Sequence, residues 1–285
     1  MPAFVTRFAP SPTGLLHRGH AFSALTACTA ARAAGGRFLL RLEDIDQVRC
    51  RPEYEAAIYE DLSWLGLGWE TPVRRQSEHL DDYRAALERL RARGLLYRCF
   101  RTRRELMEAI GHAPHGPEAA VFRGGPPAPD EERARLERGE PFAWRLSLDA
   151  ARRELGPAWN GLAFTEEGRG PQGQSGRIPA RPELAGDVIL ARKDLGVAYH
   201  LAVVVDDALQ GVTHVIRGED LFEAAHVQRL LQALLDLPEP VYRHHRLLLR
   251  PDGRRYAKRD TAETLRGVRE AGTSAEALRR ELGFD

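Results

Sequence analysis

Apolar positions along the first forty residues change from the period of a strand to that of a helix and back. Residues 3–8 are typical of a strand, and the Pro/Gly-rich stretch after them cannot extend it. An Ala-rich helix is predicted for residues 18–34, and Gly35-Gly36 ends it. Residues 37–42 form a second apolar strand. This order opens a βαβ unit and predicts a parallel sheet with a right-handed crossover.

Helical spacing returns over residues 52–65 and 81–93. Between residues 99 and 184 the pattern breaks into short helices separated by Pro, Gly and charged clusters, which is typical of an inserted subdomain. The later chain is predicted to contain strands over residues 187–191, 201–205, 213–217 and 241–249, a helix over 222–235, and two short helices from residue 261. We expect one discontinuous α/β domain.

Composition excludes several classes of protein. A chain of 285 residues can bury a sizeable core without disulfides, and it contains no apolar run of the roughly 18 residues that a membrane span needs. The N-terminus lacks the pattern of a signal peptide. Cys28, Cys50 and Cys99 are widely spaced, as in reduced cytosolic proteins. We therefore expect a cytoplasmic protein with no membrane contact.

Charge is balanced, with 42 basic and 41 acidic residues, so the total neither requires nor excludes a nucleic-acid partner. Lys193 and Lys258 are the only lysines among the basic residues. A lysine that persists where arginine is otherwise used hints that a compact ammonium is needed. Lys258 lies in a basic segment, residues 254–259, which suits a clamp over polyphosphate; a solvated surface loop is the alternative.

The strongest local motif is His17-Arg18-Gly19-His20, after the first strand and at the start of the first helix. A helix N-terminus offers backbone N–H groups to a phosphate, and two imidazoles three residues apart could stabilise charge on phosphorus. Two surface histidines would be the ordinary alternative. Residues 41–46, Arg-Leu-Glu-Asp-Ile-Asp, follow the second strand, where acidic groups can meet a ligand's ammonium or form a solvated turn. Arg217-Gly218-Glu219-Asp220 follows a later strand, and its arginine is suited to bind a carboxylate ligand. A salt bridge within a β-turn is the alternative.

Together these motifs resemble the catalytic half of the class I glutamyl-tRNA synthetases. The resemblance rests on residues 7–14 (Arg-Phe-Ala-Pro-Ser-Pro-Thr-Gly), the His17 motif, residues 41–44, residues 199–207 (Tyr-His-Leu-Ala-Val-Val-Val-Asp-Asp) and residues 217–220. It implies an α/β fold: a Rossmann parallel sheet of the HUP type with an inserted subdomain and a short C-terminal helical segment. It also implies activation of L-glutamate by ATP with Mg²⁺.

Site residues follow from the same resemblance. His17, Gly19 and His20 match the family's HIGH signature, which contacts ATP, and Lys258 matches the second lysine of its KMSKS-type loop, although that loop departs from the pattern at three of its first four positions. His17, His20 and Lys258 are thus the expected catalytic residues. The glutamate-binding positions of the family correspond to Arg7, Ala9, Ser11, Glu43, Tyr199 and Arg217.

Two departures resemble the family's truncated paralogues. The chain ends soon after Lys258, so that no anticodon-binding domain is expected, and Val203 replaces an Asn that glutamyl enzymes generally carry. The resemblance then implies transfer of glutamate to queuosine at the wobble position of tRNA(Asp). Alternatives are a minimal enzyme that charges a tRNA 3′ end and a non-catalytic RNA-binding paralogue; a small-molecule adenylyltransferase of the same fold is more distant.

The insertion is expected to contact the anticodon stem-loop of tRNA(Asp) through Arg98, Arg101, Arg103 and Arg104, unless these form a solvated helix face. Family members often bind zinc there, but Cys99, His112 and His115 offer three ligands where a closed site needs four, so we expect no metal. Domain limits are placed at residues 1–96 and 186–243 for the two Rossmann halves, 97–185 for the insertion and 244–285 for the loop and C-terminal helices. A monomer is expected.

Overall fold

The computed structural model describes residues 3–101, 122, 124–192, 196–249 and 264–284. Its opening βαβ unit has the predicted elements: β1 (Val5–Phe8), α1 (Arg18–Ala33) and β2 (Arg37–Leu42), with β1 and β2 parallel. Gly36 is needed at the turn, because a Cβ there would lie 2.3 Å from the carbonyl oxygen of Phe4. The buried face of α1 consists mainly of alanines, which lets the helix pack closely on the strands.

The two predicted helices that follow are α2 (Pro52–Trp64) and α3 (Leu80–Ala92). Pro52 at the first helical position and acidic residues in the first turn favour the start of α2. Between the helices lie β3 (Glu70–Arg75), which the pattern did not predict, and a 3₁₀ turn, η1 (Gln76–Glu78). Because β3 pairs in parallel with β2, it extends the first sheet to the order β1-β2-β3.

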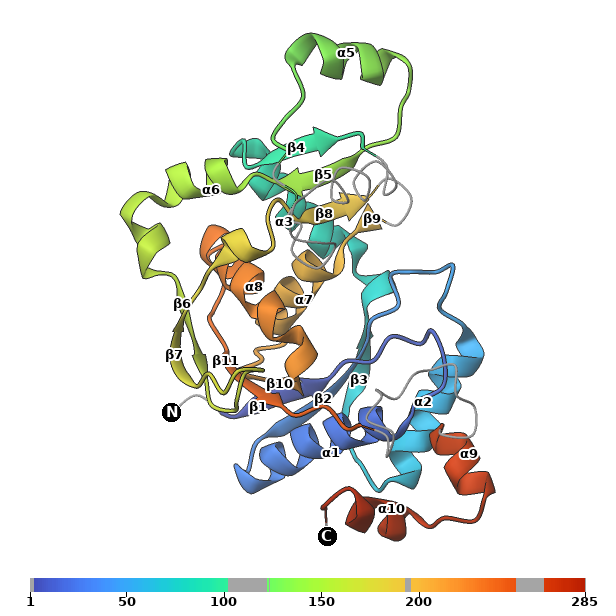
Figure 1. Ribbon diagram of the computed structural model, residues 1–285. Coiled ribbons are helices and arrows are strands. Elements are labelled where there is room, and N and C mark those ends of the chain that lie inside the picture. The colour runs from blue at the N-terminus through green and yellow to red at the C-terminus, as the bar shows by residue number, and fades with distance from the viewer. Residues whose placement is uncertain (1–2, 102–121, 123, 193–195, 250–263, 285) are drawn as a thin grey trace.

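A second sheet continues the first. It has the order β10-β11-β6-β7, formed by β6 (Ala163–Glu166), β7 (Gly176–Pro179), β10 (His214–Gly218) and β11 (Val241–His245). The N–H of Thr213, just before β10, donates to the carbonyl oxygen of Val5 at 2.9 Å, which brings β10 beside β1. Strands β10, β11 and β6 are parallel, and β7 is antiparallel to β6. The two sheets thus form one layer with the switch in strand order at β1 and β10 (Figure 1).

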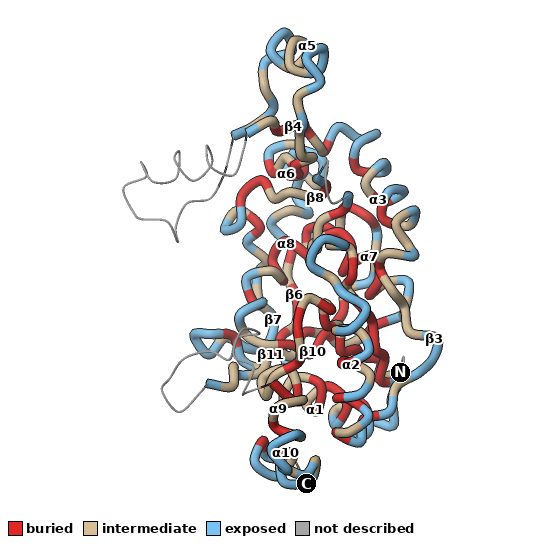
Figure 2. Tube along the Cα trace, turned by 90° about the vertical axis from the view of Figure 1, so that its right-hand side faces the viewer, coloured by how far each residue is buried: buried red, intermediate tan, exposed pale blue. Residues whose placement is uncertain are grey.

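Helices cover both faces of this layer (Figure 1). Phe38, Leu40 and Leu42 of β2 pack with α1, whereas Leu39 packs in the cluster that includes residues of α8 (Phe222–Leu234). Burial on both faces explains why these strands are continuously apolar. The buried positions run through the middle of the molecule, and exposed ones dominate at its two ends (Figure 2).

The predicted strand over residues 201–205 is wrong, because these residues lie inside α7 (Tyr199–Leu209). Every residue from Leu201 to Asp207 is buried, since α7 packs against α3 and α8. A helix buried on all sides has no polar face, so its apolar run resembles that of a central strand. The useful signal is length, because eleven residues without Gly or Pro exceed an ordinary strand.

The predicted strand at residues 187–191 exists, but it does not resume the parallel sheet. It is β8 (Ile189–Arg192), and it belongs to an antiparallel sheet of order β4-β5-β8-β9. The partners are β4 (Leu96–Cys99), β5 (Ala143–Leu146) and β9 (Gly196–Val197). Helices α5 (Pro129–Glu137) and α6 (Leu148–Leu155) lie around this sheet (Figure 1). The 3₁₀ turn η2 (Gly156–Gly161) follows α6, and η3 (Pro182–Leu184) follows β7. The domain limits given above stay predictions.

The chain closes with the expected short helices, α9 (Leu265–Glu270) and α10 (Ala275–Glu281), at the opposite end from α5 (Figure 1). A 3₁₀ turn, η4 (Glu219–Leu221), joins β10 to α8. Across the described ranges, no helix has both the length and the apolar character to cross a membrane.

Candidate active site

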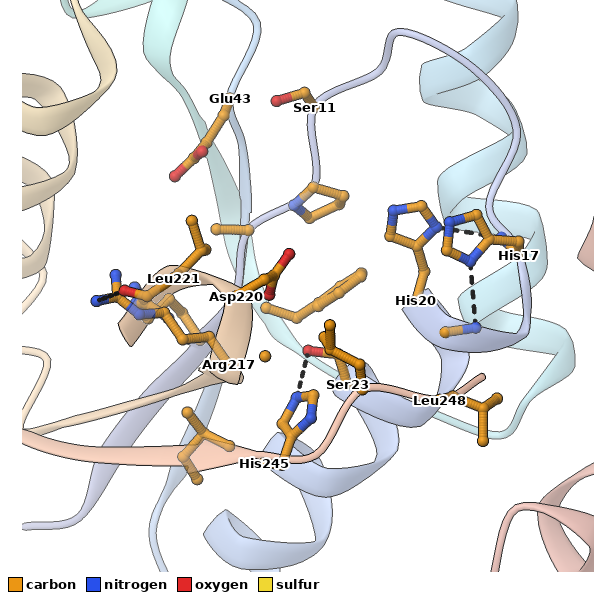
Figure 3. A pocket seen from close by; sticks show the side chains of 18 of the residues that line it. Ser11, His17, His20, Ser23, Glu43, Arg217, Asp220, Leu221, His245 and Leu248 are labelled. Atoms are coloured by element: carbon orange, nitrogen blue, oxygen red, sulfur yellow. Dashed lines mark hydrogen bonds between the residues drawn. The ribbon is translucent and has the colours of Figure 1, made fainter. Parts of the chain in front are cut away.

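A pocket of about 520 Å³ lies at the carboxyl ends of β1, β2 and β10 (Figure 3). This is the edge at which open parallel sheets bind ligands, and the volume is typical of small-molecule sites. The structure brings together here all the site residues named from the sequence that it describes: Arg7, Ala9, Ser11, His17, Gly19, His20, Glu43, Tyr199 and Arg217.

His17 and His20 form one edge of the pocket (Figure 3). His17 is the N-cap of α1: its Nδ1 accepts from the N–H of Gly19 at 3.1 Å, and Nδ1 of His20 accepts from the N–H of His17 at 3.2 Å. An imidazole that accepts at Nδ1 carries its proton at Nε2 when neutral. Both rings, with centroids 3.8 Å apart, therefore have an Nε2–H donor.

The start of α1 offers an anion fewer backbone N–H groups than a bare helix N-terminus would. The N–H groups of His17 and Gly19 are used by the two imidazoles, so at these two positions the donors that can face an anion are Nε2–H of the rings. Gly19 permits the cap, because a Cβ there would lie 3.0 Å from Cε1 of His17.

Arg217 lies at another edge of the pocket, on β10 (Figure 3). Its Nε donates to Nε2 of His244 at 3.0 Å, Nη1 to Oε1 of Gln228 at 2.9 Å, and Nη2 to the carbonyl oxygen of Leu221 at 3.0 Å. Although the residue is only 5% exposed, none of the described acidic residues forms an ion pair with it. A buried cation without a counter-ion is costly, and so this edge favours an anionic ligand.

Arg7 is held quite differently, because Asp207 of α7 neutralises it. Nε of Arg7 donates to Oδ1 of Asp207 at 2.9 Å and Nη2 to Oδ2 at 3.2 Å, while Nη1 of Arg41 donates to the same Oδ1 at 2.7 Å. Burial acts to raise the pKa of Asp207, but Arg7 and Arg41 outweigh it and hold that pKa below its usual value. Arg7 thus has a fixed position before any ligand binds.

Glu43 and Tyr199 complete the wall between these two arginines. Oε1 of Glu43 accepts from Nη2 of Arg41 at 3.3 Å, and the carboxylate points into the pocket (Figure 3). Burial raises the pKa of Glu43, and Arg41 acts against that shift. Burial also raises the pKa of the Tyr199 hydroxyl, so Tyr199 is a neutral hydrogen-bonding group at physiological pH.

Asp206 supports the wall from behind, a role that sequence reasoning missed. Its completely buried carboxylate accepts from Nε of Arg74 at 2.7 Å, from Nε2 of Gln76 at 2.8 Å and from the hydroxyl of Tyr83 at 2.8 Å. These bonds tie β3, η1 and α3 to α7. The motif contains both Asp206 and Asp207, but their different roles became clear only from their positions on α7.

Further residues line the pocket that the sequence did not single out: Ser23, Leu221, His245, Leu247 and Leu248. Nε2 of His245 lies 3.1 Å from Oγ of Ser23, which joins β11 to α1 (Figure 3). Nothing in the local sequence marks these positions, because they lie on a helix, a 3₁₀ turn, a strand end and the segment after β11, which only the fold brings together.

Lys258, together with the other residues of the basic segment 254–259, lies outside the described residues. The chain on both sides of residues 250–263 reaches the site. Leu248 lines the pocket, and the N–H of Leu265 donates to the carbonyl oxygen of Leu16 at 2.8 Å, while Thr264 forms a β-bridge with His17.

Of the residues expected to contact RNA or metal, Arg98 and Cys99 lie in β4 of the antiparallel sheet. Arg98 is internally engaged: its guanidinium lies 4.7 Å from the Trp144 ring centroid, and Nη1 donates to Glu132 at 2.8 Å. Arg101 is exposed, and Arg103 and Arg104 lie outside the described residues. Cys99 is buried in β4, and His112 and His115 are likewise not described. No metal-binding group of three or more His, Cys, Asp or Glu occurs among the described residues, and absence of zinc stays a prediction.

Comparison with known proteins agrees with the fold and the pocket described above. The family model described as "tRNA synthetases class I (E and Q), catalytic domain" matches residues 3–152 and 171–284. Glutamyl-Q tRNA(Asp) synthetase of Rhodobacter capsulatus is 49% identical, over 98% of this chain and 100% of its own length. The protein of the same name from Symbiobacterium thermophilum is 44% identical, over 98% of this chain and 85% of its own.

Among solved structures, a glutamate-tRNA synthetase from Elizabethkingia anophelis superposes with a TM-score of 0.77 at 27% identity. The match covers 98% of this chain and 61% of the other, so this chain spans about three fifths of the length of that relative. The similarity therefore extends to the whole arrangement of sheet, insertion and C-terminal helices.

Proposed function

This chain belongs to the family of class I tRNA synthetases for glutamate and glutamine, and from that premise we propose that it activates L-glutamate with ATP and transfers the glutamate to queuosine at the wobble position of tRNA(Asp). The proposed acceptor rests on the relatives named glutamyl-Q tRNA(Asp) synthetase, one of which is matched over its whole length. One observation carries the activation step: the same pocket contains an arginine that no described acidic residue neutralises and a pair of imidazole donors.

In this proposal Arg217 binds the side-chain carboxylate of glutamate, because its charge is the one at the pocket that no described carboxylate neutralises. Glu43 faces the ammonium of the substrate, whose charge would favour the ionised form of Glu43 against the effect of burial. Tyr199 offers its hydroxyl, and Arg7, with Ala9 and Ser11 on the same segment, fixes the remaining wall.

ATP, bound as its Mg²⁺ complex, occupies the edge near Gly19, with its phosphates facing Nε2–H of His17 and His20 and the ammonium of Lys258. The α-carboxylate of glutamate attacks the α-phosphorus, the bond to the β-phosphate oxygen breaks, and pyrophosphate leaves. Since the carboxylate is already ionised, no general base is needed, and catalysis depends on positioning and on donors that meet the growing charge.

In the second step a hydroxyl of the cyclopentene-diol ring of queuosine attacks the activated carbonyl carbon and AMP leaves, which gives an ester. The insertion, through exposed groups such as Arg101, contacts the phosphates of the anticodon stem-loop. We propose that the reaction takes place in the cytoplasm and that the enzyme is a monomer.

The test measures transfer of labelled glutamate to bulk tRNA from cells with and without queuosine. We expect labelling that requires queuosine and is abolished in Lys258→Ala. Equal labelling of both tRNA pools would instead indicate a minimal enzyme that charges tRNA 3′ ends. No labelling of either pool would indicate a non-catalytic paralogue, whereas glutamate-dependent exchange between ATP and pyrophosphate would exclude it.

A further inference from the structure

A chain of three buried side chains runs from β6 through β11 to the pocket. Glu166 ends β6, His244 lies on β11, and Arg217 lies on β10; they are 1%, 2% and 5% exposed. Oε2 of Glu166 lies 2.5 Å from Nδ1 of His244, and Nε2 of His244 accepts from Nε of Arg217 at 3.0 Å. Of the three, only Arg217 lines the pocket, so Glu166 and His244 act on a ligand through it.

The hydrogen-bond roles along this chain are fixed by chemistry. An arginine is always a donor, so Nε2 of His244 must be the unprotonated acceptor. The proton of the neutral ring then lies on Nδ1, where the carboxylate of Glu166 accepts it. Burial lowers the pKa of His244 and the charge of Arg217 acts in the same direction, while the bond to Glu166 opposes them. A neutral ring with its proton on Nδ1 satisfies every partner.

Glu166 is also fixed in orientation. Its Oε1 accepts from the N–H of Gly168 at 2.7 Å and from the N–H of His244 at 2.9 Å. Gly168 must lack a side chain here, since a Cβ would lie 2.2 Å from the carbonyl oxygen of His244. Both carboxylate oxygens are thus engaged, and Oε2 is always the atom that faces His244.

We propose that Glu166 and His244 are positioning residues that hold Arg217 ready for the side-chain carboxylate of the substrate, with the Nδ1–H tautomer of His244 as the element that connects them. This inference rests on the proposed function, and it names the device by which the pocket selects an acidic amino acid. Because His244 is neutral, Glu166 orients the guanidinium without touching it. Direct contact between Glu166 and Arg217 would neutralise the charge that the substrate needs.

The variant Glu166→Gln tests the relay of Glu166, His244 and Arg217 sharply. The two backbone N–H groups keep the amide oxygen of Gln at the Oε1 position, so its NH₂ group faces Nδ1 of His244. The ring must then accept at Nδ1 and carry its proton on Nε2, where it opposes the N–H of Arg217. We expect the KM for glutamate to rise about tenfold to a hundredfold, as for loss of a hydrogen bond to a charged group, and the KM for ATP to stay unchanged.

Glu167→Gln is the matched control. Glu167 is the next residue, but its carboxylate pairs with Arg243 at 2.8 Å outside the pocket. The same chemical change there should leave both KM values unchanged. In a His244→Asn background, Glu166→Gln should add little further effect, because the element through which it acts is gone.

The tautomer itself is measured by ¹⁵N NMR of the wild-type imidazoles, with the His244 signals assigned by their loss in His244→Asn. We expect a proton on Nδ1 and an unprotonated Nε2. A charged ring, a proton on Nε2, or equal changes of both KM values in Glu166→Gln would overturn the relay. Wild-type protein without glutamate-dependent exchange would contradict the proposed function, and the NMR result alone would then decide on the relay.

Discussion

Arg41 donates to Asp207 at 2.7 Å inside the wall of the pocket, and both side chains are buried. Because Arg7 binds the same carboxylate, Asp207→Asn would remove the carboxylate that neutralises buried Arg7 and would leave Arg41 with Glu43 and Asp206 only. We expect a loss of about 3–5 kcal/mol in the free energy of unfolding, measured by urea denaturation at pH 7. Asp81→Asn, in an exposed pair with Arg84, is the control and should have little effect.

The difference in the free energy of unfolding between wild type and Asp207→Asn should depend on pH in one direction only. The folded-state pKa of Asp207 lies below its unfolded value, so its contribution to stability is fully present above about pH 4 and is lost as the pH falls through the folded-state pKa. An Asp207→Asn effect that stayed constant into strong acid would contradict this assignment.

Asp61 of α2 should affect the pH dependence of stability in the opposite direction to Asp207. Neither of its buried oxygens has a hydrogen-bond partner among the described residues, and Nη2 of Arg269 on α9 is 3.9 Å away. Burial raises the pKa of Asp61 to about 6. The ionised form therefore destabilises the fold above about pH 6, and this cost disappears as the pH falls to the unfolded value near 4.

Asp61→Asn removes the buried charge. We expect the variant to be more stable than the wild type by about 1–3 kcal/mol at pH 8 and no more stable at pH 4, in thermal or urea unfolding. Glu60→Gln on the same helix, which loses an exposed ion pair with Arg269, serves for comparison. A gain that did not depend on pH would show that ionisation of Asp61 is not the cause.

His17 combines a structural and a chemical role that two variants separate. Asn is a good N-cap, so His17→Asn keeps the acceptor for Gly19 but loses the Nε2–H donor. We expect ATP–pyrophosphate exchange to fall by about 10²–10³ with stability nearly unchanged. His17→Ala should lose the same activity and also about 1 kcal/mol of stability. Full activity in His17→Asn would mean that only the cap matters.

Substitution of Arg101 and substitution of Arg98 should affect tRNA binding differently. Arg101 is exposed, whereas Arg98 is paired with Glu132 and stacked on Trp144. Arg101→Ala should weaken tRNA binding and reduce the slope of log affinity against log salt concentration by about 1, as for loss of one phosphate contact. Arg98→Ala should lower stability and leave that slope unchanged. Identical slopes for wild type and Arg101→Ala would remove Arg101 from the interface.

Much of the Rossmann half could be predicted from the sequence, because its strands and helices follow periodicity and end at Gly35-Gly36 or begin at Pro52. The pocket could be anticipated for the same reason, since the motifs follow strands whose carboxyl ends meet at one edge. The assignment failed where burial removed periodicity, as in α7, and at β8, because its antiparallel pairing with β5 joins segments about 45 residues apart.

Glu166 and His244 could not be found from the sequence. Glu166 lies in a polar, glycine-rich stretch that is typical of a surface loop, and His244 has a second histidine beside it. Their roles depend on one parallel pairing, Tyr242 with Glu166, that joins segments about 75 residues apart. Such a contact leaves no local signal.

The pairing of β6 with β11 also limits how the enzyme could be shortened. Excision of the whole stretch between β4 and β8, to obtain a minimal amino-acid-activating core, would delete Glu166 along with β5, the strand that pairs with β4 and β8. If the proposed relay of Glu166, His244 and Arg217 is to be kept, the cut must spare residues 163–179, although the sequence places them in the inserted subdomain.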